Sequence, residues 1–388
     1  MKKLVINIKI ILIIVFFPVF LLLSEKSHAQ ITESPESIFV KKVEAILLNS
    51  CLRKKNFGVK IHSLERDKTL YSVYSDRLFS PASNLKLLTT AVALKRLGAN
   101  YRFKTALYAT LPIVGKILEG DIYIKGFGDP NLVSEQMWLL ANELKNSPLK
   151  KVRGNIIADA SFFDSNRRVK TWKKKAGVEA YNAPLGALSF NFNTVAVHVT
   201  PGEKKGDRPI VVVDPDIEFI RVDNRARTAS KPKYGRLIVN RVDRGDHNVI
   251  TVSGTMPVNS RRETYYLNIT QPTHYAAMVF KEYLLQAGVE VMGKVRVGSV
   301  PEGAYELFSH ESIPLSLILR GLNKFSNNFV AEQILKTIAA EIYGEPGTTL
   351  NGLRAMDEYM QSLQYKTDEF SILDGSGLSR QSQLSPDQ

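Results

Sequence analysis

The sequence of 388 residues holds a single cysteine, Cys51. One cysteine excludes a disulfide within the chain and any metal site made of several thiolates. Cys51 follows the apolar run 45–48, so we expect its thiol to be packed rather than reactive. A chain of this length can bury enough apolar surface to fold without such cross-links.

The sequence also lacks three motifs that mark large enzyme classes. There is no His-Glu-x-x-His, no glycine-rich phosphate-binding loop and no serine with glycine at both second neighbours. Their absence argues against zinc metalloproteases, nucleotide-dependent enzymes and α/β-hydrolases. We therefore predict neither a cofactor nor a metal.

Acidic residues are in the minority, since 38 aspartates and glutamates face 52 lysines and arginines, for a net charge of +14. No nucleic-acid motif accompanies this charge, so we predict no nucleic-acid partner. An exported chain of this kind would meet anionic wall polymers or membrane headgroups instead. A solvated basic surface explains the charge equally well.

The first 29 residues have the pattern of a secretory signal. Three lysines precede fourteen apolar residues, 10–23, and small residues then stand around Ala29. Fourteen residues interrupted by Pro18 fall short of the roughly 20 needed to span a bilayer. We predict that residues 1–29 are a cleaved signal peptide and that the protein is exported to the periplasm or cell envelope.

The periodicity of apolar residues changes twice along the chain. A helix is predicted to begin at Pro35, and a hairpin to follow over 57–74. From about 101 to 298 short alternating runs predict strands, interrupted by one helix over 276–287; after Ser312 the helical period returns. We predict a mixed α/β (α+β) fold in which a helix-and-sheet domain is split by a β-rich insertion of about two hundred residues.

The pattern serine-x-x-lysine occurs three times, at Ser83/Lys86, Ser147/Lys150 and Ser230/Lys233. Only Ser83 precedes a run with helical periodicity, so its helix would place serine and lysine on one face. The helix N-terminus favours an alkoxide on Ser83 and a neutral Lys86, which acts as a base only if its pKa falls by about 3 units. The alternative is a helix-capping serine beside a solvated lysine.

A second pattern, serine-x-asparagine, occurs at Ser326/Asn328 between two predicted helices. A serine hydroxyl there could relay a proton and the asparagine amide could hold a substrate carbonyl. Ser189/Asn191 shows the same spacing, so the alternative is again a helix cap.

In this order and context the two patterns resemble the penicillin-binding enzyme superfamily. More narrowly, nearly the whole chain after the leader resembles the class C low-molecular-mass penicillin-binding proteins, which are D-alanyl-D-alanine carboxypeptidases and endopeptidases of peptidoglycan. The resemblance is carried by the stretches 81–86, 126–130, 154–159, 182–189, 323–328 and 374–379.

This resemblance implies roles for five residues. Ser83 would be the acylated nucleophile, Lys86 its base, and Ser326 and Asn328 the proton relay and substrate clamp. Asp159 falls where relatives carry an aspartate that contacts the amino end of the peptide stem. The implied partners are peptidoglycan peptide stems and, as covalent inhibitors, β-lactam antibiotics.

The resemblance also predicts the domain boundaries. Residues 30–104 would form the first part of a transpeptidase-like domain, 105–302 two β-rich inserted subdomains, and 303–388 an incomplete second part. The third family motif, lysine-threonine-glycine, occurs nowhere in the sequence. In relatives its strand contributes an oxyanion donor, and losing such a donor costs about a hundredfold to a thousandfold in rate. We therefore expect a truncated chain, with C-terminal strands and helices missing, that is weakly active or inactive.

Two other functions remain open at this point. A β-lactamase would share the acylation step and then hydrolyse the adduct quickly. A non-catalytic peptidoglycan-binding protein would use the basic β-rich domains and keep a vestigial site.

Overall fold

The computed structural model describes residues 33–49, 57–172, 177–230 and 236–388. The predicted signal peptide and Cys51 lie outside these ranges. Two compact units are present, Met1–Ser75 with Asp387 and Asp76–Pro386 with Gln388. None of the helices in the described ranges is long and apolar enough to cross a lipid bilayer.

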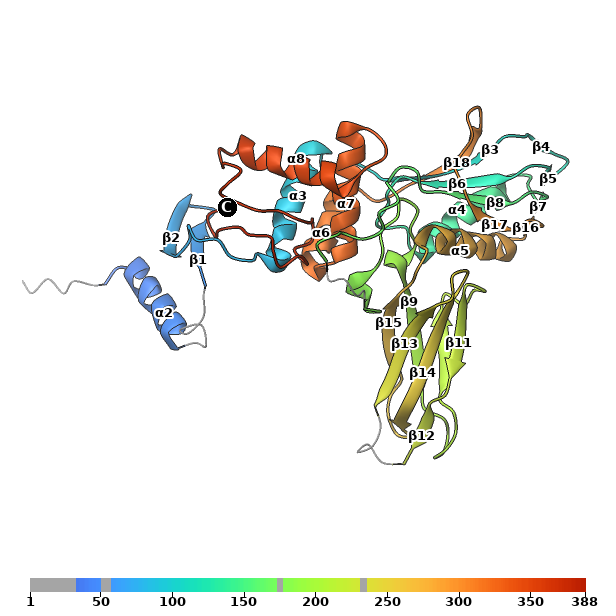
Figure 1. Ribbon diagram of the computed structural model, residues 1–388, viewed down its shortest axis with the longest axis horizontal. Coiled ribbons are helices and arrows are strands. Elements are labelled where there is room, and N and C mark those ends of the chain that lie inside the picture. Colours follow the sequence, from blue (N-terminus) through green and yellow to red (C-terminus); the bar gives the residue numbers. More distant parts are fainter. Residues whose placement is uncertain (1–32, 50–56, 173–176, 231–235) are drawn as a thin grey trace, which may run out of the picture. The chain divides into compact units, whose positions relative to one another are not determined.

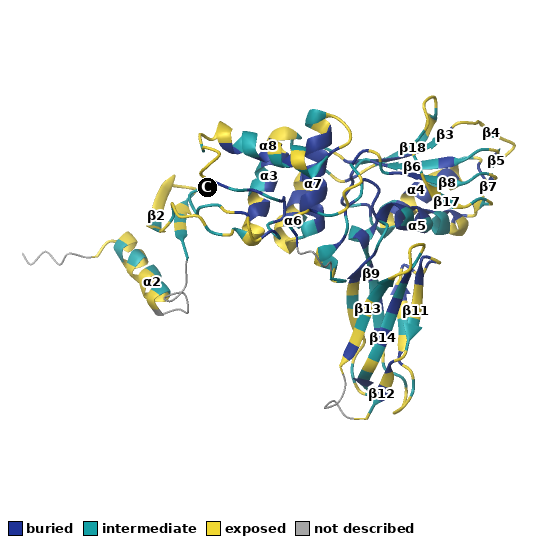
Figure 2. Ribbon diagram, viewed as in Figure 1, coloured by how far each residue is buried: buried dark blue, intermediate teal, exposed yellow. Residues whose placement is uncertain are grey.

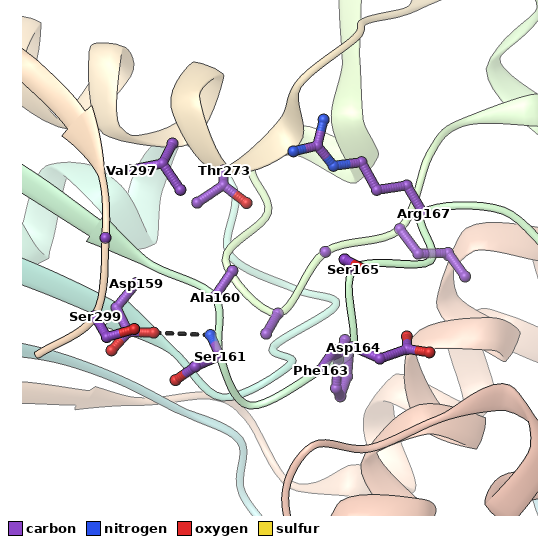
Figure 3. A pocket seen from close by; sticks show the side chains of 14 residues that line it. Asp159, Ala160, Ser161, Phe163, Asp164, Ser165, Arg167, Thr273, Val297 and Ser299 are labelled. Atoms are coloured by element: carbon purple, nitrogen blue, oxygen red, sulfur yellow. Dashed lines mark hydrogen bonds between the residues drawn. The ribbon is translucent and has the colours of Figure 1, made fainter.

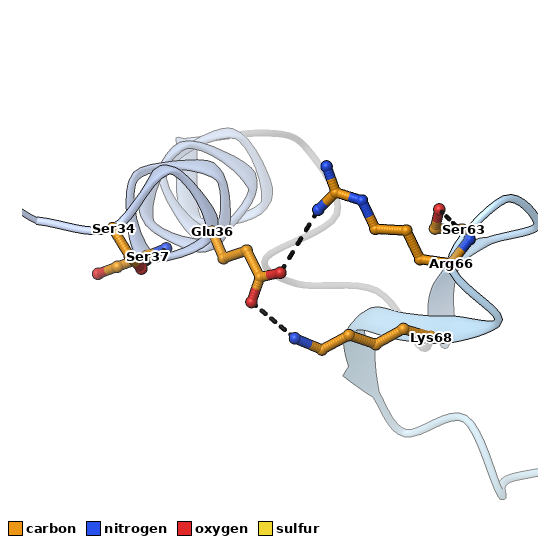
Figure 4. Close-up of polar contacts among 6 residues, drawn as sticks. All are labelled: Ser34, Glu36, Ser37, Ser63, Arg66 and Lys68. Carbon is orange, nitrogen blue, oxygen red and sulfur yellow. Dashed lines mark hydrogen bonds and ion pairs between the residues drawn. The ribbon is translucent and has the colours of Figure 1, made fainter.

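In the described part of the first unit there are one helix and one hairpin (Figure 1). Helix α2 (Pro35–Asn49) begins at the predicted proline, and strands β1 (Val59–Ser63) and β2 (Lys68–Val73) pair antiparallel. Glu36 joins them, because its carboxylate accepts from Lys68 Nζ at 2.7 Å and from Arg66 Nη1 at 3.5 Å (Figure 4). These side chains are exposed, so the ion pairs contribute little stability.

The helical part of the second unit is arranged around one buried helix, α7. Residues 329–340 of α7 are all buried, which is the pattern of a helix with neighbours on every side (Figure 2). Its packing partners include α3 and α8, and α3 also contacts α6. The bounds are α3 (Leu85–Arg96), α6 (Leu315–Phe325), α7 (Asn328–Tyr343) and α8 (Thr349–Ser362).

In the described ranges, all strands of the second unit lie between α3 and α6 in sequence. A five-stranded sheet has the order β17-β8-β6-β3-β18, and a four-stranded sheet the order β16-β7-β5-β4. Their strands are β3 (Lys104–Ala109), β4 (Ile113–Val114), β5 (Ile117–Leu118), β6 (Ile122–Gly126), β7 (Lys151–Val152), β8 (Ile156–Asp159), β16 (Glu290–Val291), β17 (Val295–Val297) and β18 (Tyr305–Glu311).

Two further sheets form the rest of the β-rich region. Strand β9 (Thr194–Thr200) lies between β10 (Ile210–Asp214) and β15 (Glu263–Asn268). Strand β14 (Asn248–Pro257) pairs with β11 (Ile220–Asn224), β12 (Arg227–Ala229) and β13 (Leu237–Asp243). Val195, Val197 and Val199 are buried while the residues between them are not, as the period of a strand requires.

The prediction of one helix within the β-rich region is wrong. Helix α5 (Pro272–Gln286) matches it, but α4 (Ser134–Asn146) is a second helix. Met137, Leu140, Ala141 and Leu144 form its buried stripe at helical spacing. Trp138 and Leu139 are exposed on the opposite side and blur that stripe in the sequence.

Strand β18 lies after the predicted boundary at 302 and pairs with β3, so the five-stranded sheet includes residues from both sides of that boundary. The domain boundaries of the sequence analysis stay predictions.

Candidate active site

Ser83 lies on an exposed turn at the start of α3. Residues Ala82–Asn84 form a single 3₁₀ turn that runs directly into the helix, slightly different from the continuous α-helix we predicted. Ala82 has a φ of 47°, an unfavourable backbone conformation for a residue with a Cβ. Such strain persists only where surrounding structure imposes it, and it stands here beside the candidate nucleophile.

Lys86 is buried directly below this turn, with 2 % of its surface exposed. Its Nζ lies 3.2 Å from Ser83 Oγ, 2.8 Å from Asn328 Oδ1 and 2.7 Å from the carbonyl oxygen of Ser376. The predicted Ser83–Lys86 pair is therefore within hydrogen-bond reach, and Asn328 is brought to the same amine.

These three partners satisfy Lys86 in both protonation states. A neutral amine donates to Asn328 Oδ1 and to the Ser376 carbonyl and accepts the Ser83 hydroxyl proton; an ammonium donates to all three. Burial lowers the pKa of Lys86, whereas Glu332 and Asp374 act in the opposite direction. The arrangement suits a group that takes up the serine proton and later returns it.

Asn328 is the first residue of α7. The Asn327 side chain caps this helix by accepting from the Val330 N–H at 3.3 Å. The Asn328 amide is held from both ends, because its Nδ2 donates to the Tyr181 carbonyl at 3.3 Å while its Oδ1 accepts from Lys86. A cap and two hydrogen bonds thus fix the side chain.

Ser326 is placed differently from Asn328. It ends α6 in the left-handed conformation, with a φ of 55°, and its side chain is exposed. Within the described ranges its hydroxyl makes no hydrogen bond to Ser83, Lys86 or Asn328. The proton-relay role of Ser326 stays a prediction.

The loop 374–379 also belongs to the site, because its Ser376 carbonyl accepts from Lys86. We predicted no role for this loop from the sequence. The Thr89 hydroxyl on α3 donates to the Gly375 carbonyl at 2.6 Å, next to the Ser376 carbonyl that binds Lys86. Asp374 is buried and anchors the loop through the N–H groups of Gly377 at 2.8 Å and Ser379 at 2.7 Å. The only sequence signal was the Asp-Gly-Ser-Gly stretch itself.

Asp159 lies apart from this network. Its oxygens accept from the backbone N–H groups of Ser161 and Val300, both at 2.7 Å, so the carboxylate ties β8 to the segment after β17. It lines a cavity of about 260 Å³, in which Figure 3 shows Arg167 and Thr273 as further lining residues. Contact with a peptide stem stays a prediction for Asp159, and its observed bonds are structural.

Two competing motifs have serines with structural hydrogen bonds, whereas Lys233 of the Ser230/Lys233 pattern lies outside the described residues. Ser189 is buried, donates to the Gly186 carbonyl and accepts from Asn193 Nδ2. Ser147 ends α4 and donates to the Leu144 carbonyl. Ser83 and Lys86 are thus within hydrogen-bond reach of each other, and their catalytic roles stay a prediction.

Comparison with known proteins agrees with this geometry. A profile described as the D-Ala-D-Ala carboxypeptidase 3 (S13) family matches residues 39–388. The chain belongs to this family. A D-alanyl-D-alanine carboxypeptidase of Actinomadura sp. strain R39 is 34 % identical over 367 residues, 92 % of this chain and 66 % of the relative.

Two further similar proteins come from Haemophilus influenzae. The D-alanyl-D-alanine carboxypeptidase DacB is 25 % identical over 332 residues, 85 % of this chain and 69 % of the relative. The crystal structure of its penicillin binding protein 4 (dacB) superimposes with a TM-score of 0.74 at 24 % identity, covering 85 % of this chain and 72 % of that one. The penicillin-binding fold with an insertion is confirmed, and the chain spans about two thirds of the length of these relatives.

Proposed function

We propose that this chain is a serine-type D-alanyl-D-alanine carboxypeptidase or endopeptidase, exported to the periplasm or cell envelope, that acts on peptidoglycan peptide stems through an acyl-enzyme. The observation that carries the proposal is the exposed Ser83 hydroxyl 3.2 Å from the buried amine of Lys86. Membership of the S13 family and the names of its relatives support the substrate class.

The reaction follows from the contacts of Lys86. Ser83 Oγ attacks the carbonyl carbon of the scissile D-Ala-D-Ala bond as its proton passes to neutral Lys86. The carbon–nitrogen bond then breaks, the acyl group stays on Ser83 Oγ as an ester, and the leaving amine takes up the proton that Lys86 had accepted. The N-terminal end of α3 places partial positive charge near Ser83, which favours the oxygen anions that form on the way. Water finally hydrolyses the ester and frees Ser83.

The same chemistry accounts for β-lactams as covalent inhibitors. The amide of the lactam ring is cleaved by the same attack, and its amine stays tethered to the acyl group. A slow hydrolysis of this adduct distinguishes a carboxypeptidase from a β-lactamase.

A fluorescent penicillin tests the proposal. We expect time-dependent covalent labelling of the purified chain that is lost in Ser83→Ala and retained in Ser147→Ala, which removes the serine of a competing motif. Mass spectrometry should locate the adduct on Ser83. Labelling that survives Ser83→Ala would refute the assignment, and rapid turnover of the penicillin would favour the β-lactamase.

A peptide-stem assay tests the substrate. Release of D-alanine from a D-Ala-D-Ala pentapeptide should also depend on Ser83. Binding to wall sacculi that persists in Ser83→Ala, without release of D-alanine by the parent chain, would favour the non-catalytic wall-binding protein. The rates of penicillin labelling and of D-alanine release also test the expectation that a chain without a lysine-threonine-glycine motif is weakly active or inactive.

A further inference from the structure

Glu332 is a buried carboxylic acid that the proposed reaction does not use. It lies four residues after Asn328 on α7, one turn further along, and its exposed fraction is 0 %. Its Oε1 accepts from the Gly375 N–H at 3.0 Å, while Oε2 is buried and makes no hydrogen bond of ordinary geometry in the described ranges. The hydroxyl and N–H of Ser376 also lie near this carboxyl and lower its pKa. A buried polar atom left in this way calls for an explanation.

The segment held by Glu332 is the one that holds the catalytic amine. The Gly375 N–H faces Glu332 on α7, whereas the carbonyls of Gly375 and Ser376 face Thr89 and Lys86 on α3. Gly375 and Ser376 therefore bridge α7 and α3 through hydrogen bonds of their backbone groups. Without the Glu332 anchor, only the α3 side and Asp374 would fix the Ser376 carbonyl.

Glu332 interacts electrostatically with three further charged groups, Asp374, Lys86 and Lys336. Lys86 comes from α3, Asp374 from the loop, and Glu332 and Lys336 from α7. Lys336 is paired with Asp164 at 2.5 Å, and Asp374 accepts from Trp172 Nε1 at 3.0 Å in addition to its backbone donors.

These groups comprise three carboxyls, Asp164, Asp374 and Glu332, but only two amines, those of Lys86 and Lys336. Burial and then the charge of Asp374 raise the pKa of Glu332 to about 8. Its ionised form in turn raises the pKa of Lys86. The two groups are therefore coupled, and each responds to the proton of the other.

We propose that Glu332 is a positioning residue for acylation, holding the Gly375–Ser376 bridge, and through it the amine of Lys86, in place from α7. The inference rests on the proposed function. It also assigns the carboxyl a second effect, since an ionised Glu332 favours a protonated Lys86, which cannot accept the Ser83 proton. Charge on Glu332 therefore opposes the base form of Lys86.

The pH dependence of labelling by fluorescent penicillin tests both effects. Glu332→Gln keeps an oxygen for the Gly375 N–H but carries no charge, so we expect its maximal rate to stay within about threefold of the parent. Its acid limb should move to lower pH by about half a unit or more, because no carboxylate then holds the proton on Lys86. Glu332→Ala leaves the N–H unpaired, and we expect its maximal rate to fall by about tenfold or more.

Glu341→Gln is the matched control. It makes the same change nine residues further along α7, on an exposed carboxylate that accepts from Tyr101, and should leave both the rate and the limb unchanged. A Glu332→Gln profile that superimposes on the parent profile would overturn the proposal, even if Glu332→Ala does not fold. So would a folded Glu332→Ala protein with the parent rate.

A measurement without any substrate separates this inference from the proposed function. The ¹³Cε signal of Lys86, assigned by its loss in Lys86→Met, can be titrated in labelled protein. We expect its pKa to fall in Glu332→Gln and to stay in place in Glu341→Gln. If the parent protein takes no penicillin, the proposed function fails, and this titration still decides whether Glu332 acts on Lys86. An unchanged Lys86 titration would overturn the inference alone.

Discussion

At the scale of single residues, the site is defined by the groups that surround the amine of Lys86. Lys86 has neighbours of three kinds, a hydroxyl, an amide oxygen and a backbone carbonyl, and none of them is a carboxylate. A directly bonded carboxylate would hold the proton on the amine, since an opposite charge within about 4 Å favours the charged form. An asparagine rather than an aspartate at position 328 therefore binds the Lys86 amine without favouring its protonated form.

The substitution Asn328→Asp tests that reading. It places a carboxylate where the amide oxygen now lies, 2.8 Å from Lys86 Nζ, and so raises the pKa of Lys86. We expect the acid limb of penicillin labelling to move to higher pH by about one unit or more. The position of the limb is the readout, because the loss of the amide can also lower the maximal rate.

Asn327→Asp is the control for this change. Aspartate caps a helix as well as asparagine does, so α7 should keep its start and the limb its position. Equal shifts in the two variants would show that the field of an added charge, rather than the bond to Lys86, is responsible.

At the scale of elements, helix start signals and apolar periodicity were sufficient to predict α3, α6, α7 and α8. They also predicted which serine-x-x-lysine pair opens a helix. They could not predict the Ser376 carbonyl as a partner of Lys86, because a backbone acceptor 290 residues away leaves no trace in the side-chain pattern. Helix α4 was missed for a local reason, its exposed Trp138 and Leu139.

The pairing of Ser83, Lys86 and Asn328 could be predicted only through family resemblance. Spacing alone gave three candidate pairs of one kind and two of the other. The burial that lowers the pKa of Lys86 depends on α7 and the loop 374–379, which no local window contains. The role of Glu332 was invisible for the same reason.

The loop 374–379 provides a prediction at this scale. Gly377 has a φ of 74°, and a Cβ there would overlap the carbonyl oxygen of Ala82, next to Ser83. We expect Gly377→Ala to lower the free energy of unfolding by about 2 kcal/mol or more and to slow penicillin labelling, since both the conformation and the close approach require glycine. Chemical denaturation and labelling rates measure the two effects.

Gly98→Ala separates the two causes. Gly98 has a φ of 86° but nothing within 4 Å of its added Cβ, so only the conformational cost of about 1 kcal/mol applies. Labelling should be unaffected. A Gly377→Ala protein that behaves like Gly98→Ala would contradict a contact between the loop and the nucleophile turn.

At the scale of the whole molecule, stability should depend on pH through buried carboxyls. Asp129 is 2 % exposed; its Oδ1 accepts from the Asn131 N–H at 2.8 Å, and its Oδ2 has no partner within the described ranges. Burial raises the pKa of Asp129 to about 7 from its ordinary 3.8. The folded protein therefore holds this proton more tightly than the unfolded chain does.

The sign of the effect follows from that difference. The contribution of Asp129 to stability is fully present below about pH 3.8 and is lost as the pH rises to about 7, by at most about 4 kcal/mol. Asp129→Asn has no proton to lose, so its stability relative to the parent should rise across this window and level off above it. Urea denaturation at several pH values measures the difference, and a constant difference would refute a raised pKa.

The hydrogen bond between Lys86 and Ser376 also joins residues that are synthesised at different times. The ribosome makes the lysine 290 residues before it makes the carbonyl that receives it, an interval of roughly 15 to 60 seconds at about 5–20 residues per second. Throughout that interval the nascent polypeptide carries Lys86 without this acceptor. Lys86 can therefore gain the acceptor that it has in the folded structure only after residue 376 has been made.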